Sequence, residues 1–354
     1  ILDSPPVGID LKEVAEARRL LAWLAEGNFT FLGYREYRLA EQDGQEALVA
    51  ETGTGLGILR YDQTASSSYD RLNARARAKA REKTLLVVTK ANSRATVHRS
   101  VYLDYIGVKT FDAAGEVIGE RRFLGLFASS AYTDSVRRIP LVNRKVAEVL
   151  SRSGFSEESH SGKDLVQILE TYPRDELFDI SVEDLTTISR AVMDMQQRRR
   201  TRLFLRHDAY GRYVSCLVYL PRDRYTTSVR LKIADVLERA FQATSLDYTA
   251  RVSESALARL HFVLRVDPAL PAPEVDREEL EAKLVEATRA WDEDLAEALA
   301  VEAGEEEAAA LHRSWGRAFP EAYKEDFAAR VAVADLRRVE DLSVAADRGG
   351  DGAA

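Results

Sequence analysis

The chain has 354 residues, of which 45% are apolar and 31% are charged, and this balance is typical of a soluble globular protein and excludes a disordered or membrane protein. Chains longer than about 250 residues usually divide into domains of about 50 to 200 residues, so we expect several modules. The 58 acidic residues outnumber the 50 basic residues, and the resulting net charge of −8 excludes a general attraction to nucleic acid or to anionic lipid.

Two further features of the whole sequence indicate its compartment. Cys216 is the single cysteine, which excludes an intrachain disulfide and a thiolate metal site and is typical of a reducing environment. No apolar run approaches the roughly 20 residues of a membrane-spanning helix, and the amino terminus lacks a signal-peptide pattern. We therefore expect a cytoplasmic protein with no membrane partner. The sequence lacks an initiator methionine, so we expect that it was cut from a longer chain. Residues 345–354 lack periodicity and should form an irregular tail.

Residues 1–138 are expected to form a first module, a mostly antiparallel sheet with a few helices. Asp10 can cap a helix that ends at Gly27, because apolar residues recur on one helical face between them. The segment 112–115 contains Asp and Gly and predicts the turn of a hairpin. Strands are predicted over 29–39, 46–49, 57–61, 85–90, 100–108 and 117–129.

Residues 139–181 are expected to form a helical bridge. Apolar residues recur at helical spacing over 139–152 and 164–172, and Pro173 ends the second helix because its ring cannot continue the hydrogen-bond ladder. A third helix, predicted over 182–199, leads from the bridge into the next module.

Residues 182–266 are expected to form a two-layer sandwich. Period-two alternation follows the helix, and residues 208–211 form a turn. The return strand places apolar side chains on one face, namely Val214, Cys216, Val218 and Leu220. A helix from residue 226 and strands over 246–252 and 257–266 complete the order αββαββ, which predicts a ferredoxin-like or ACT-like module.

The last part of the chain predicts a linker followed by helices. Residues 267–276 contain three prolines and should be stiff, and residues 277–354 should form a helical connector and tail. One long helical stripe of apolar residues runs from Leu280 to Ala298, opposite a strongly acidic face. A further helix or helix pair carries aromatic residues, namely Trp315, Phe319, Tyr323 and Phe327.

The motifs of enzyme active sites are missing or isolated. Gly53, Gly55 and Gly57 lack the spacing of a dinucleotide fingerprint, and no Gly-Lys-Ser/Thr follows them, which favours a turn before a strand over a phosphate loop. The five histidines are scattered, and no Gly-x-Ser-x-Gly is present. Cys216 lies on the apolar face of a strand and should be a core residue, whereas His261 should face solvent or an interface. We therefore expect no catalytic residue, no cofactor-binding residue and no metal ligand.

Arginines gather where the third bridging helix gives way to a strand. They are Arg198, Arg199, Arg200, Arg202 and Arg206. Cations at the C-terminus of a helix stabilise its dipole, and this interpretation is favoured over an anion site. RNA binding is an alternative, because RNA-recognition modules share the four-stranded sheet. Their aromatic motif is missing here, so nucleic acid is not the expected partner.

A cluster of polar residues on two predicted neighbouring strands is the candidate ligand site. Its members are Lys90, Arg94, His98, Arg99, Asp104 and Lys109. On adjacent antiparallel strands these groups could converge on a small anion such as a carboxylate, with Arg94 or Arg99 binding it bidentately. Salt bridges within the hairpin explain the same residues equally well, so both interpretations stay open.

Several ordered strings carry a resemblance to a known family. They are Asn28–Tyr37, Thr89–Arg94, Tyr102–Tyr105, Gly119–Leu126, Ile168–Leu177, Pro221–Tyr225 and Ala318–Tyr323. From Pro5 to Leu342 the chain resembles the amino-terminal region of the large bacterial NAD-specific glutamate dehydrogenases. The resemblance implies a PAS-like module over 1–138 and an ACT-like module over 182–266, ahead of a Rossmann-type catalytic core further along the parent chain.

The resemblance also implies a function. Enzymes of this family oxidatively deaminate L-glutamate to 2-oxoglutarate and ammonium and reduce NAD, so NAD is the implied cofactor of the parent enzyme. Because no motif of that core occurs in this chain, the implied role is a non-catalytic regulatory and assembly fragment of a homo-oligomer. The implied partners are an amino-acid effector and, as in actinobacterial members, an FHA-domain regulator. An amino-acid-sensing allosteric module and an RNA-binding module are the alternatives.

Overall fold

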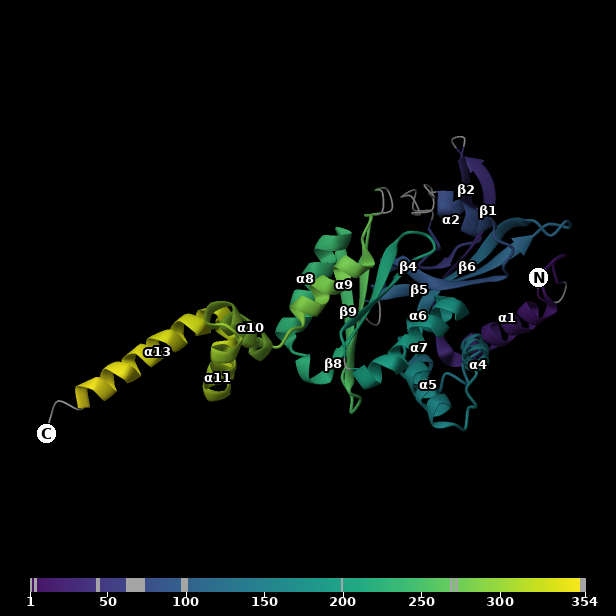
Figure 1. Cartoon of the computed structure of the whole chain (residues 1–354). Helices are drawn as coiled ribbons and strands as arrows, with labels where there is room; N and C mark the ends of the chain where they lie inside the picture. Colours follow the sequence, from purple (N-terminus) through teal and green to yellow (C-terminus); the bar gives the residue numbers. More distant parts are fainter. Residues whose placement is uncertain are drawn as a thin grey trace.

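The protein consists of two antiparallel sheets joined by a group of helices, followed by a helical arm that projects away from them (Figure 1). The computed structural model describes residues 2, 5–42, 45–61, 74–96, 101–198, 200–267, 270 and 273–350. This architecture confirms the expected α+β class with antiparallel sheets. Within the described part of the chain, no helix is long and apolar enough to cross a membrane.

The first sheet has the strand order β2-β1-β6-β5-β4, with the short β3 paired to β1. Its strands are β1 (Phe29–Gln42), β2 (Gln45–Ala50), β3 (Leu56–Gly57), β4 (Leu86–Arg94), β5 (Tyr102–Phe111) and β6 (Val117–Phe127). Helix α1 (Leu11–Trp23) begins at the predicted cap, where the Asp10 carboxylate accepts from the Lys12 amide at 2.9 Å. The predicted hairpin turn is also present, since one Asp112 oxygen accepts from the Ala114 and Glu116 amides.

Two local predictions in this module need correction. The strand expected over 57–61 stops at Gly57, because the next residues curl back in turns and the Arg60 amide donates to the Gly57 carbonyl at 3.1 Å. Helix α2 (Ala74–Arg81) was not predicted. Its repeating alanine and basic residues have high helix propensity but lack an apolar stripe, which explains why periodicity alone missed it.

Five helices connect the sheets: α3 (Ser129–Thr133), α4 (Val142–Ser153), α5 (His160–Thr171), α6 (Arg174–Asp179) and α7 (Val182–Arg198). The predicted helices correspond to α4, α5 and α7, and Pro173 does end the second of them. Helix α6 was missed, although Pro173 is a favourable residue just before a new helix. The buried face of α7 packs with α4 and α5, and this core continues into both sheets.

The second sheet has the order β7-β8-β10-β9 and is covered on both faces. Its strands are β7 (Arg202–His207), β8 (Tyr213–Pro221), β9 (Ser245–Arg251) and β10 (Leu257–Arg265). On one face, the predicted apolar stripe of β8 packs against α8 (Thr227–Phe241) and α9 (Arg277–Ala287). On the other face, Phe204, Leu217 and Tyr219 join the core of the bridging helices.

The connector differs from the single long helix that its apolar stripe predicted. Helix α9 ends near Thr288, whose hydroxyl donates to the Val285 carbonyl, and α10 (Trp291–Ala303) starts anew. Helix α9 packs into the core of the second sheet, where Leu280 and Leu284 are buried. We call residues 291–350 the arm: it consists of α10, α11 (Glu305–Trp315), α12 (Glu321–Asp326) and α13 (Ala329–Gly350). Because α13 continues to Gly350, the expectation of an irregular tail is wrong for 345–350.

Candidate functional site

The short helix α6 lies between the two sheets and brings charged residues into their interface. Its first turn carries Asp175 and Glu176, and its Phe178 ring stacks on Phe127 of β6 with ring centres 4.5 Å apart. Lys145 of α4 is buried and donates to the carbonyls of Leu177, Phe178 and Ile180 at 2.7–3.0 Å. A cation at the C-terminal end of a helix satisfies carbonyls that have no partner within the helix, so Lys145 fixes the position of α6.

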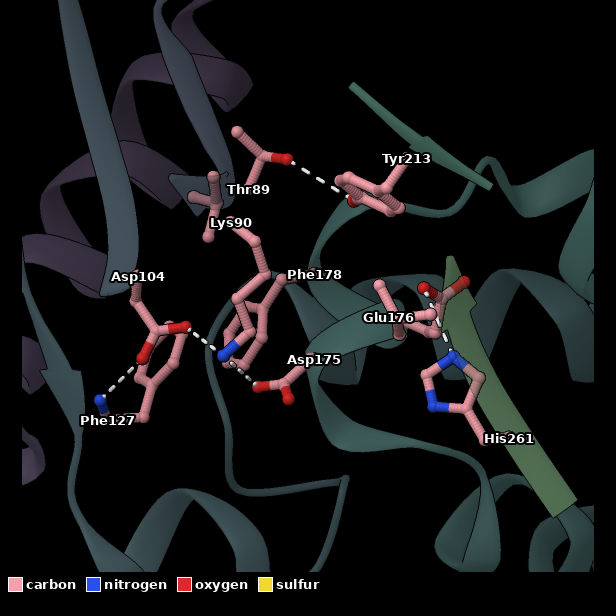
Figure 2. Close-up of a pocket in the computed structure, with 11 residues that line it drawn as sticks. Thr89, Lys90, Asp104, Phe127, Asp175, Glu176, Phe178, Tyr213 and His261 are labelled. Carbon is pink, nitrogen blue, oxygen red and sulfur yellow. Dashed lines mark hydrogen bonds and ion pairs between the residues drawn. The ribbon is translucent and has the colours of Figure 1, made fainter. Parts of the chain in front are cut away.

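The side of α6 toward the first sheet holds a buried ion-pair cluster (Figure 2). Lys90 Nζ of β4 lies 2.5 Å from Asp104 Oδ1 of β5 and 3.2 Å from Asp175 Oδ1 of α6. The second Asp104 oxygen accepts from the Phe127 amide at 2.8 Å, and the Tyr132 hydroxyl donates to Asp175 at 2.9 Å. Burial raises the pKa of Asp104 to about 6, although Lys90 acts in the opposite direction.

The side of α6 toward the second sheet holds a second cluster. Arg206 of β7 binds Glu176 bidentately at 2.7 and 2.8 Å and reaches Asp179 Oδ2 at 2.8 Å. Burial pushes the pKa of Glu176 upward, but Arg206 and then His261 outweigh burial and hold this pKa well below its ordinary value. His261 Nε2 lies 3.0 Å from Ser215 Oγ and 3.7 Å from Glu176 Oε1. The expected placement of His261 at an interface thus matches the structure.

The two sheets also touch directly along β4. Arg212 donates to the Thr89 hydroxyl at 3.0 Å, and Arg265 donates to the Ala91 carbonyl at 3.1 Å. Arg94 binds both carboxylate oxygens of Asp247 in β9 at 2.6 and 2.7 Å. Together with the two clusters around α6, these bonds form what we call the α6 interface. It joins the first sheet, the bridging helices and the second sheet.

Three family models match the part of this chain from α4 onward. Glutamate dehydrogenase helical motif 1 matches residues 139–198, the glutamate dehydrogenase ACT2 domain matches 202–292, and glutamate dehydrogenase helical motif 2 matches 298–342. The chain is 41% identical over 339 residues to the NAD-specific glutamate dehydrogenase of Halomonas elongata, covering 95% of this chain and 21% of that protein. This chain belongs to the NAD-specific glutamate dehydrogenase family.

Two further members of the family have similar coverage. The NAD-specific glutamate dehydrogenase of Pseudomonas aeruginosa is 40% identical over 343 residues, and that of Mycobacterium tuberculosis is 37% identical over 345 residues. The matches cover 97% and 94% of this chain. The chain spans about a fifth of the length of these relatives.

The structure places the predicted ligand residues of this glutamate dehydrogenase region in separate environments. Lys90 and Asp104 meet, but they bind each other and Asp175. Arg94 lies further along β4 with Asp247. Lys109 is buried and donates to the carbonyls of Lys79 in α2 and Glu82 just after α2, at 2.9 and 2.6 Å.

Two members of the predicted set, His98 and Arg99, lie outside the described residues. Sequence reasoning also missed Asp175 and Glu176, and it assigned Arg206 to the end of a helix. The conspicuous string 168–177 contains both acids, but nothing in it indicates that their partners lie in β4 and β7.

The space inside the α6 interface is too small for a metabolite. The cavity lined by Lys90, Asp104, Asp175, Glu176 and His261 has a volume of about 40 Å³. A volume of this size can hold water, whereas pockets for small ligands usually measure about 300 Å³ or more. The arrangement therefore joins modules by buried charge pairs and offers no room for a substrate.

The other candidate groups occupy structural positions. Cys216 is fully buried in the second sheet, and burial raises the pKa of its thiol well above the ordinary value. Gly57 has a φ of +60° and pairs with Gly33, and a side chain there would collide with the Leu32 carbonyl, so the glycine-rich segment forms a tight turn beside β1. Among the described residues, no group of three or more His, Cys, Asp or Glu side chains could hold a metal ion.

Proposed function

We propose that this chain is the amino-terminal, non-catalytic regulatory and assembly region of a cytoplasmic NAD-specific glutamate dehydrogenase. In the parent enzyme, NAD and L-glutamate would react in a core that lies outside this chain. The observation that carries the proposal is the α6 interface, in which charged residues of four elements, β4, β5, α6 and β7, pair around a cavity of about 40 Å³. Such an interface connects modules, and it does not bind a substrate.

The energetics of the interface suit the transmission of a conformational change. Removing one partner of a buried ion pair typically costs about 3–5 kcal/mol, because the other charge stays buried without compensation. Lys90, Asp104, Glu176 and Arg206 all have side chains less than one-fifth exposed. A displacement of the ACT module against α6 would therefore displace the first, PAS-like module with it. In a homo-oligomer, the same rigid unit would present a defined surface to neighbouring subunits.

The proposal is tested first on this chain and then on the full-length enzyme. We expect the chain alone to produce no NADH from L-glutamate and NAD, as measured by absorbance at 340 nm. In the full-length enzyme, Arg206→Met should alter glutamate saturation or the mass of the assembly, whereas Arg152→Met on the exposed face of α4 should alter neither. Turnover by the isolated chain, or an Arg206→Met enzyme with unchanged saturation and mass, would contradict the proposal.

An amino-acid-sensing role is a second candidate, favoured by the match to the ACT2 domain over 202–292. Calorimetry of the full chain against a panel of amino acids would test it, and the absence of heat and of a thermal shift would count against it. RNA binding receives no comparable support. Both faces of the second sheet are covered among the described residues, which leaves no open face on which bases could stack.

A further inference from the structure

An open groove of about 390 Å³ lies between α1 and α4. These two helices lie at the opposite end of the protein from the arm (Figure 1). One wall comes from α1 and carries Arg19, and the other comes from the start of α4 and carries Arg144. Arg137 lies in the segment before α4 and completes the rim. Val146 and Leu150 of α4 contribute an apolar floor. The groove is separate from the α6 interface and falls within the usual size range of small-ligand sites.

The charge of the groove favours an anion. Its three arginines face two carboxylates, since Arg19 pairs with Glu16 and Arg137 pairs with Glu157. Arg144 is exposed and forms no ion pair with the other described residues, which leaves the lining with a net charge of +1. The Arg137–Glu157 pair is half-exposed, and pairs of this kind contribute little to stability, so a ligand can replace Glu157 at low cost.

The distribution of the charges distinguishes between kinds of anion. A guanidinium binds a carboxylate in a planar, bidentate geometry, and here the guanidinium groups belong to two walls and a rim instead of one point. The floor between the walls is apolar, which suits a short methylene chain better than water. A compact anion such as phosphate lacks the methylene chain that would cover this floor.

We propose that this groove binds a small dicarboxylate, with one carboxylate on Arg144 and the other on Arg19 or Arg137. The chain between the carboxylates would lie on Val146 and Leu150. This site goes beyond the proposed function and does not depend on it, because binding can be measured on this chain whether or not the parent is regulated through it.

Titration calorimetry of the full chain with glutarate tests the proposal. We expect one site in the millimolar range or tighter, and binding of butyrate, which has one carboxylate, at least about tenfold weaker, as the loss of one charge-assisted contact predicts. Arg144→Ala should weaken glutarate binding by about tenfold, and Arg144→Lys, which keeps the charge but loses the planar fork, should weaken it by less. Arg152→Ala is the matched control, since Arg152 lies further along α4 and pairs with Glu148 outside the groove.

Three results would overturn the proposal. The first is no heat with glutarate at about 10 mM. The second is equal affinity for glutarate and inorganic phosphate, which would mean that the groove does not recognise paired carboxylates. The third is an unchanged affinity in both Arg144 variants, with their fold verified by circular dichroism. Arg144 is exposed, so these variants are expected to fold like the unmodified chain.

Discussion

Arg206→Met tests whether the buried charges around α6 hold the modules together. The substitution keeps most of the length of the side chain but removes the cation that binds Glu176 and Asp179. The Glu176 side chain is only 7% exposed, so its carboxylate cannot recover hydration without local opening. We expect a loss of about 3–5 kcal/mol in the free energy of unfolding. The control Arg152→Met breaks a half-exposed pair with Glu148 and should cost less than about 1 kcal/mol.

The same variant has a predicted pH signature. In the unmodified chain, the pKa of Glu176 lies below its ordinary value of 4.5, so the stability contributed by Glu176 is present above pH 4.5 and is lost as the pH falls below it. Without Arg206, burial dominates and raises this pKa, so ionisation of Glu176 destabilises the fold as the pH rises above 4.5. The loss in free energy of unfolding caused by Arg206→Met should therefore be largest at pH 7 and become smaller toward pH 4.5.

Urea unfolding at pH 7 and pH 5, followed by far-ultraviolet circular dichroism, measures both effects. Because the chain contains several modules, the comparison should use the first unfolding transition. A deficit at pH 7 no larger than that of Arg152→Met would refute the reasoning. So would a deficit that grows as the pH falls, because it would show that Glu176 is not the destabilised group.

Three further predictions concern other parts of the core. Phe178→Ala removes a buried ring that stacks on Phe127 and should cost about 3–5 kcal/mol, measured by urea unfolding. Because burial raises the pKa of Asp104 to about 6, its contribution to stability should decline as the pH rises from about 4 to 6, and Asp104→Asn should remove this decline. Cys216 should react with a thiol reagent only as fast as the second sheet unfolds, and rapid reaction under native conditions would contradict its burial.

The parts of the fold that were predicted from the sequence have repeating patterns. The apolar stripe of β8 was predicted because four alternating residues lie on one face, and the hairpin at 112–115 because Asp and Gly favour that turn. The break between α9 and α10 was not predicted, because the apolar stripe continues through it. At the break, the Thr288 hydroxyl donates to the Val285 carbonyl and accepts from the Thr201 hydroxyl. An apolar stripe indicates which side of a helix is buried, but it does not indicate where the helix ends.

The candidate site could not be predicted for a different reason. Helix α6 has six residues, fewer than two turns, so it shows no periodicity. The partner of Asp175 is 85 residues away in β4, and the partner of Glu176 is 30 residues away in β7. The arginines near Arg206 were interpreted as cations that stabilise the C-terminus of α7, because the spacing of residues in the sequence reveals only local pairing. In the structure, Arg206 binds the acids of α6 instead.

The mixture of apolar and charged contacts at the α6 interface has a consequence for regulation. Its apolar core includes Phe127, Phe178 and Tyr219, and apolar surfaces of similar shape tolerate alternative packing. Lys90 and Arg206 do not tolerate it, because any other docking of the sheets would leave their buried partners without a counter-charge. We therefore infer that these charges select one orientation of the two sheets. An effector that acts through the ACT module would have to break these pairs together or leave them intact, which makes the response a switch between states instead of a gradual displacement.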